Sequence, residues 1–86
     1  MVANKELCNG WRNRQTWNIA LWVMNDESLY FTAAAYRQKC ENRGVKATYR
    51  GFIAWAGLYG SRTPDGYKYD SQILDYKSLS AMIRGI

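Results

Sequence analysis

The sequence contains no histidine among its 86 residues. Histidine is the most common general acid–base group in enzymes and the most common metal ligand. The two cysteines, Cys8 and Cys40, stand too far apart in the chain to form a zinc-ligand pair. The sequence has neither a phosphate-binding loop ending in Gly-Lys-Ser/Thr nor a Gly-x-Ser-x-Gly nucleophile motif. We therefore expect no catalytic residue, no metal and no cofactor.

Carboxylates are few and scattered along the chain. Asp65, Asp70 and Asp75 form the only acidic series, and their even spacing matches no EF-hand loop, which needs ligands at closer intervals and a closing Glu. A turn former, a loop acid and a helix cap account for the three residues. This pattern, with the missing histidine, predicts that the chain is not an enzyme.

Long apolar runs are missing as well. The first six residues lack the apolar core of a secretory signal, and no run approaches the roughly 18 apolar residues that cross a bilayer. We expect a cytoplasmic protein with reduced thiols and no membrane partner. A disulfide between Cys8 and Cys40 is the disfavoured alternative.

Aromatic residues, by contrast, are abundant: four Trp, seven Tyr and two Phe. Each can bury roughly 150–250 Å², so a single core is feasible, and residues 1–86 are expected to form one small helical domain with 1–10 as a loosely ordered arm. Seven tyrosines exceed what one small core can hold, so some should lie at the surface. The net charge of +5 favours an anionic partner.

Helical spacing of apolar residues predicts an all-α fold, a compact bundle of about four short helices with one long loop. The segments are 13–24, 26–42, 49–59 and 76–84, with Asn13, Asp26, Thr48 and Asp75 as N-caps. Gly51 and Gly57 either weaken the third helix by about 1 kcal/mol each or permit close packing. The loop, 61–71, centres on Thr63-Pro64-Asp65-Gly66. The alternative is an α+β fold with a short hairpin near 61–73.

The first of these segments is apolar nearly all round. Trp17, Ala20, Leu21 and Met24 form one stripe, and the opposite side carries Ile19, Trp22 and Val23. Such a helix is either central in its domain or shared with a partner. A homodimer and a fully covered monomer both remain open at this point.

Basic residues cluster between the second and third helices. Five fall within a short stretch that contains a single acid, Glu41, and they form a predicted partner-binding patch: Arg37, Lys39, Arg43, Lys46 and Arg50. Read functionally, the patch contacts phosphates or an acidic surface. The alternative is a solvated helix face on which Arg43 complements a helix C-terminus.

A second candidate site lies at the start of the first helix. Interleaved aromatic and arginine side chains can stack on bases or anchor a protein interface, and the residues concerned are Trp11, Arg12, Arg14 and Trp22. The favoured alternative is that Trp11 covers the first helix while the arginines stay in water.

The stretch from Asn9 to Trp22 contains the pattern Gly-Trp-x-Asn-x-x-Thr-Trp with a further Trp five residues on. It resembles a family of small uncharacterised proteins of phages, cyanobacteria and other prokaryotes. Thr63-Pro64-Asp65-Gly66, Leu74-Asp75 and Leu79 resemble that family's closing segment more loosely. The resemblance carries no activity, but it implies a phage or mobile-element setting and, for a phage protein, the cytoplasm of the host.

These observations favour a non-enzymatic binding protein of phage type. Its expected partner is a host protein or a protein–nucleic-acid complex, engaged for example as a counter-defence inhibitor of a CRISPR or restriction complex. The first alternative is a small basic protein that binds DNA or RNA. The second is a homo-oligomeric structural protein.

Overall fold

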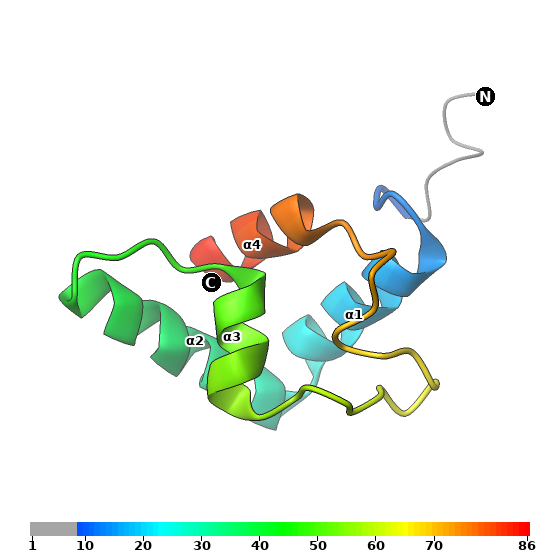
Figure 1. Ribbon diagram of the computed structural model, residues 1–86, viewed down its shortest axis with the longest axis horizontal. Coiled ribbons are helices and arrows are strands. Elements are labelled where there is room, and N and C mark those ends of the chain that lie inside the picture. The colour runs from blue at the N-terminus through cyan, green and yellow to red at the C-terminus, as the bar shows by residue number, and fades with distance from the viewer. Residues whose placement is uncertain (1–8) are drawn as a thin grey trace.

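The computed structural model describes residues 9–86, and these form an all-α bundle (Figure 1). Its helices are α1 (Arg14–Asn25), α2 (Glu27–Asn42), α3 (Tyr49–Ala56) and α4 (Tyr76–Arg84). The predicted fold class is confirmed. Most of the predicted N-terminal arm, and Cys8 with it, lies outside the described residues. None of the four helices is long and apolar enough to cross a membrane.

All four predicted N-caps are confirmed. In each helix the side-chain oxygen of the capping residue accepts a hydrogen bond from a backbone N–H of the first turn, which would otherwise have no intrahelical acceptor. The donor and acceptor pairs are Thr16 to Asn13 (2.8 Å), Leu29 to Asp26 (3.0 Å), Gly51 to Thr48 (3.0 Å) and Ser78 to Asp75 (3.2 Å).

Helix α3 ends earlier than predicted. Gly57 adopts a left-handed conformation with a φ of 72°, and the backbone N–H of Leu58 bonds back to the carbonyl of Ile53 at 2.8 Å. Glycine takes this conformation without steric cost, so it ends the helix. The predicted extension to Tyr59 is therefore wrong, and this tyrosine lies outside the helix with 49% of its surface exposed.

Gly51 permits close packing between α2 and α3. A β-carbon at this position would collide with the phenol oxygen of Tyr36, whose side chain is buried on α2. That same oxygen accepts a hydrogen bond from the backbone N–H of Thr48 at 3.3 Å. Of the two roles weighed for this glycine, the close-packing role is the one that the structure shows.

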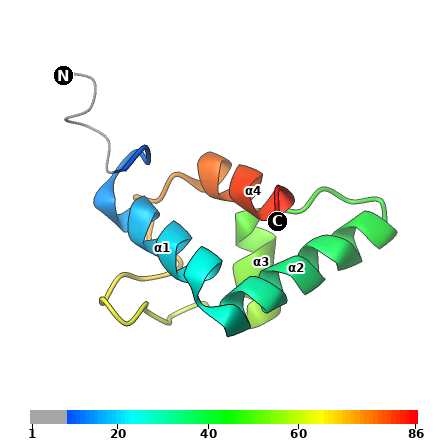
Figure 2. The ribbon, with the colours of Figure 1, turned by 180° about the vertical axis from the view of Figure 1, so that it is seen from behind.

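α2 and α4 hold the bundle together, because each of them contacts the other three helices. Figures 1 and 2 show α4 beside α1 and α3 from both sides. The core between the helices is aliphatic and aromatic, and its fully buried members are Ile19, Val23, Ala33, Tyr49, Phe52, Ile53, Leu79 and Ile83.

The buried face of α1 differs from the predicted stripe. Ile19, Ala20 and Val23 are buried, whereas Leu21 and Met24 are exposed at 36% and 45%. The spacing of Ile19, Ala20 and Val23 is that of one helix face, and α2 and α4 are the helices that contact α1. The side of α1 opposite the predicted stripe is thus the side that packs in the core.

Tyrosines divide between core and surface, as expected. Tyr36, Tyr49 and Tyr69 are buried, whereas Tyr59 is exposed. The phenol of Tyr49 donates a hydrogen bond to the carbonyl of Tyr69 at 2.7 Å, so its hydroxyl keeps a partner inside the core. Burial raises the pKa of the Tyr49 phenol well above its usual range.

The long loop between α3 and α4 folds back along α1 (Figures 1 and 2). Within it, Arg62 and Lys68 form an isolated antiparallel bridge, and the turn between them is closed by a bond from the N–H of Gly66 to the carbonyl of Thr63 at 2.8 Å. A single bridge makes no strand, so residues 61–73 are a loop and not the hairpin of the α+β alternative.

Candidate functional site

A cluster of polar side chains joins α1 to the long loop. Asn18 is buried in α1. Its amide donates to a carboxylate oxygen of Asp65 at 2.8 Å, and its carbonyl oxygen accepts from the hydroxyl of Thr63 at 2.7 Å. The indole N–H of Trp22 donates to the same Asp65 oxygen at 2.9 Å. The Asn18 and Trp22 hydrogen bonds lower the pKa of Asp65.

A second set of contacts joins the start of α1 to the start of α4. The hydroxyl of Thr16, which is fully buried, accepts from the backbone N–H of Asp75 at 3.0 Å, and the amide of Asn13 donates to the carbonyl of Ile73 at 2.7 Å. Hydrogen bonds from Ser78 are the main cause that lowers the pKa of Asp75, with Arg12 adding to the effect. The turn at Thr63 and Asp65 and the segment that precedes α4 are therefore both tied to α1 and its N-cap.

These contacts assign structural roles to the tryptophan-rich motif. Asn13 and Thr16 bind the segment before α4, and Trp22 binds the turn that contains Asp65. The motif in α1 thus binds the Thr63-Pro64-Asp65-Gly66 turn directly, although the two segments lie far apart in the sequence.

The four residues of the predicted aromatic and arginine site have separate environments. Trp11 is half-buried, packs against the core and borders a shallow groove with Ser78 and Met82 of α4. Arg12 lies 3.6 Å from the carboxylate of Asp75, and Arg14 is exposed. Trp22 is held by Asp65. The favoured alternative expected Trp11 to cover α1, whereas the groove that it borders is formed with α4. Partner binding by the four residues stays a prediction.

Two members of the predicted basic patch have partners within the chain. Arg37 forms an ion pair with Glu41 at 3.1 Å, one turn along α2. The guanidinium carbon of Arg50 lies 4.4 Å from the centre of the Tyr76 ring, a cation–π contact that joins α3 to α4. These two arginines contribute to packing as well as to surface charge.

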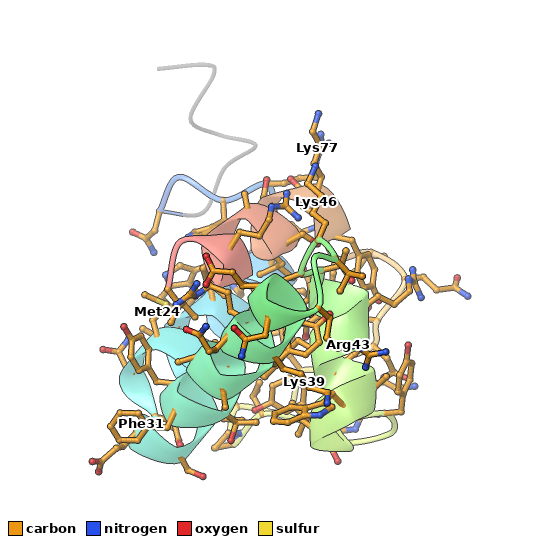
Figure 3. The ribbon with its side chains drawn as sticks, turned by 90° about the vertical axis from the view of Figure 1, so that its left-hand side faces the viewer. Met24, Phe31, Lys39, Arg43, Lys46 and Lys77 are labelled. Carbon is orange, nitrogen blue, oxygen red and sulfur yellow. The ribbon has the colours of Figure 1, made fainter. Side chains whose placement is uncertain are left out.

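The other three members are free of such contacts. Lys39, Arg43 and Lys46 are exposed, and within residues 9–86 their side chains make no ion pair or hydrogen bond. They come from the end of α2 and the segment that follows it, and Figure 3 shows them on the same side of the molecule. We call these three residues the basic end.

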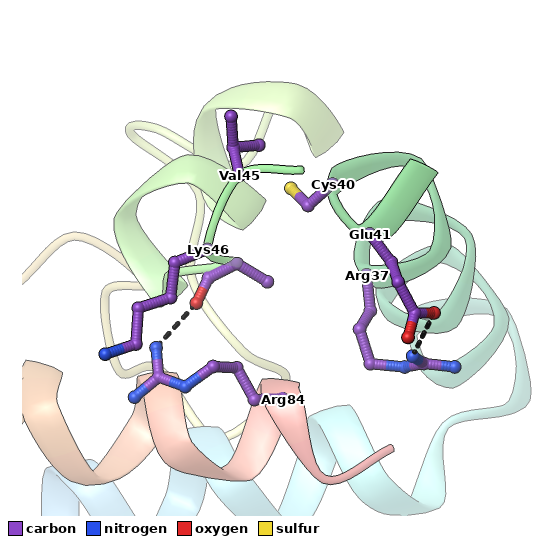
Figure 4. A pocket seen from close by; sticks show the side chains of 7 residues that line it. Arg37, Cys40, Glu41, Val45, Lys46 and Arg84 are labelled. Atoms are coloured by element: carbon purple, nitrogen blue, oxygen red, sulfur yellow. Dashed lines mark hydrogen bonds and ion pairs between the residues drawn. The ribbon is translucent and has the colours of Figure 1, made fainter. Parts of the chain in front are cut away.

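A cleft beside the basic end adds a cation that lies outside the patch predicted from the sequence. Arg84, the last residue of α4, donates from Nη1 to the carbonyl of Ala47 at 2.7 Å and borders the cleft together with Arg37 and Lys46 (Figure 4). In the sequence Arg84 reads only as the basic residue that ends the last helix. Only the packing of α4 against α2 brings it to this place.

Exposed aromatic side chains also lie on α2 and α3. Trp55 of α3 is 47% exposed and packs beside Tyr36 of α2, with 6.0 Å between the ring centres. Tyr36 lies one helical turn before Lys39 on α2. Phe31 is 61% exposed and makes an edge contact with Tyr30. Trp55 thus places a large aromatic surface near the basic end.

Within residues 9–86 no three potential metal ligands of the His, Cys, Asp and Glu types gather in one place. Residues 4–86 match the model of a family described as "Family of unknown function (DUF7249)", and the chain belongs to that family. Searches of curated proteins and of solved structures found no significant match.

Proposed function

We propose that this member of the DUF7249 family is a non-enzymatic binding protein whose basic end contacts an acidic surface of another macromolecule. The observation that carries the proposal is the group of three exposed cations, Lys39, Arg43 and Lys46, with no acidic partner within residues 9–86. Unpaired surface cations attract an anionic partner and speed its encounter. The net charge of +5 acts in the same direction.

The partner proposed first is a host protein or nucleoprotein complex. The resemblance of the motif in α1 to phage proteins supports a phage setting for this proposal, and the proposed location in that setting is the host cytoplasm. In that setting a small domain with a charged end and an exposed tryptophan, Trp55, suits the blocking of a larger complex such as a CRISPR or restriction enzyme. Tryptophan and arginine are the residues that most often dominate interface energies.

A matched pair of double variants tests the proposal. Lys39→Glu/Arg43→Glu reverses two charges of the basic end, and the control Lys68→Glu/Lys77→Glu reverses two exposed lysines, one on the long loop and one on α4. With a photo-crosslinker at Asn42, we expect host complexes to be captured by the wild-type protein and by the control, and not by the basic-end variant. Equal capture by both variants would remove the basic end from the proposal.

The second candidate function is direct binding of DNA or RNA, and the position of Trp55 near the basic end favours it. Nucleic-acid binding by cations weakens by roughly 0.7–0.9 log units per contacted phosphate for each log unit of salt, and exposed aromatics stack on bases. Anisotropy titrations of labelled single-stranded and duplex oligonucleotides at several salt concentrations measure this slope. A smaller slope for Lys39→Glu/Arg43→Glu than for the control variant would support the second candidate over the first.

A further inference from the structure

The cleft beside the basic end has walls from three separate parts of the chain. The last turns of α2, the segment from Val45 to Ala47 and the last residue of α4 enclose about 200 Å³. One water molecule takes up about 30 Å³ in the liquid, so the cleft has room for a small anionic group. Figure 4 shows Lys46 and Arg84 on one side of it and Arg37 with Glu41 on the other.

Charge in this cleft is strongly biased. Arg37, Lys46 and Arg84 contribute three positive charges, and Glu41 is the only acid among the lining residues, which leaves a net charge of two positive units. Charge alone therefore matches a doubly negative group better than a single carboxylate.

The two arginines are positioned before any ligand arrives. Glu41 holds Nη1 of Arg37 at 3.1 Å, and the carbonyl of Ala47 holds Nη1 of Arg84 at 2.7 Å. Each guanidinium has five N–H donors, so most remain available for a ligand. The Nε of Arg37 is buried and has no acceptor within the described residues, a costly state for a charged donor.

We propose that this cleft binds a phosphate monoester, held by Arg37, Lys46 and Arg84. The inference deepens the proposed function and rests on it, because the phosphate would be the group of the anionic partner that docks beside the basic end. A phosphate monoester carries about −1.5 to −2 charges near neutral pH and three strong acceptor oxygens, which matches both the charge and the unused donors. Arginine suits it because its planar fork binds two oxygens at once.

Side chains must supply the binding, because α2 and α4 both end near the cleft and helix C-termini carry partial negative charge. Removing one cation should therefore weaken binding substantially. The probe is inorganic phosphate, added at constant ionic strength to the ¹⁵N-labelled full chain and followed by NMR. We expect saturable shifts in the backbone amides of residues 37–47 and 84 and in the arginine Nε signals.

Two variants and one control make the assignment specific. Lys46→Met removes an exposed cation that has no partner in the described chain, and Arg84→Met removes the cation from α4. Each should weaken phosphate binding by about tenfold, the usual loss for one hydrogen bond to a charged group. Lys68→Met, in the long loop, should leave binding unchanged. The proposal would be overturned if phosphate caused no shifts in the wild-type protein. It would also be overturned if Lys46→Met and Arg84→Met both bound phosphate with the wild-type affinity.

A further arm identifies the source of the phosphate. A 5′-phosphorylated oligonucleotide is compared with the same strand ending in a 5′-hydroxyl, and a phosphoserine peptide with its unmodified form. If the protein prefers the phosphorylated member of one pair, and Arg84→Met loses this preference, the result supports the cleft proposal and identifies the source of the phosphate. Equal binding to both members of each pair contradicts the proposal. If Lys39→Glu/Arg43→Glu loses its macromolecular partner while wild-type protein ignores phosphate, the cleft proposal fails and the proposed function stands.

Discussion

The buried hydroxyl of Thr16 joins the beginnings of two helices. It donates to the side-chain oxygen of Asn13, the N-cap of α1, at 2.6 Å and accepts from the backbone N–H of Asp75, the N-cap of α4, at 3.0 Å. At the level of single residues, this protein depends on a few such polar groups that each satisfy two neighbours. Losing one leaves a buried donor or acceptor unpaired.

Replacing Thr16 by Val keeps the shape of the side chain and removes both hydrogen bonds. We expect Thr16→Val to lower the free energy of unfolding by about 1–3 kcal/mol, because the N–H of Asp75 loses its acceptor in a partly buried place. Urea denaturation measures the change. The control is Thr32→Val on α2, whose hydroxyl bonds only to the carbonyl of Ser28, and it should change stability by less than about 0.5 kcal/mol. Equal losses in the two variants would contradict the role given to Thr16.

Asp65 makes the attachment of the long loop depend on pH. Hydrogen bonds from Asn18 and Trp22 lower the pKa of the folded protein's Asp65 below its ordinary value of 3.8. A lowered pKa means that the charged form favours the folded state, so the stabilisation is complete above pH 3.8 and is lost as the pH falls through the lower, folded value. Asp65→Asn should therefore be less stable than wild type near neutral pH.

That difference should shrink as the pH falls below the ordinary pKa of Asp65, where the wild-type carboxylate is itself protonated. Thermal unfolding of both proteins, measured at several pH values between 7 and 2, gives this stability difference as a function of pH. A stability difference that is the same at every pH would show that charge on Asp65 plays no part.

At the scale of elements, the start of each helix follows from residues close to it in the chain. Asn13, Asp26, Thr48 and Asp75 act as caps, as their position before an apolar segment predicts, because a cap needs only a backbone N–H three residues away. The end of α3 was predicted less well, since Gly57 and Gly60 both offer a left-handed conformation and local sequence does not choose between them.

Gly51 is the point where two elements approach most closely, and it gives a prediction with an unusual sign. Replacing glycine by alanine inside a helix ordinarily raises the free energy of unfolding by up to about 1 kcal/mol. Here, however, the new methyl group collides with the phenol of Tyr36. Overpacking of this kind costs about 1–3 kcal/mol. We therefore expect Gly51→Ala to lower the midpoint of urea denaturation.

Two further variants give this prediction its controls. Gly85→Ala places its methyl group in ordinary contact, 3.6 Å from the nearest backbone oxygens, and should be close to neutral. Tyr36→Phe removes the colliding oxygen, so adding Gly51→Ala to Tyr36→Phe should cost less than adding it to wild type. A Gly51→Ala protein more stable than wild type would show that α2 and α3 pack less closely than described.

For the whole molecule, the main question left by the sequence was whether α1 needs a second chain to cover it. Ile19 and Val23 are fully buried within one chain, and Trp22 has a hydrogen-bond partner in Asp65. Single exposed apolar residues such as Leu21 and Met24 are common on monomers. We expect sedimentation equilibrium to give a monomer of 10.0 kDa. A mass of twice this value would favour the homo-oligomeric alternative.

Local chemistry in the sequence was enough to predict the helical class, the four caps and the turn at Pro64, because each depends on groups a few residues apart. The basic residues 37–50 were also visible, since they are neighbours in the chain. Only the tertiary structure decided which face of α1 is buried, that Arg50 contacts Tyr76, and that Arg84 joins Arg37 and Lys46 at one cleft. These features join residues from separate helices, so they are fixed by how the helices pack against one another.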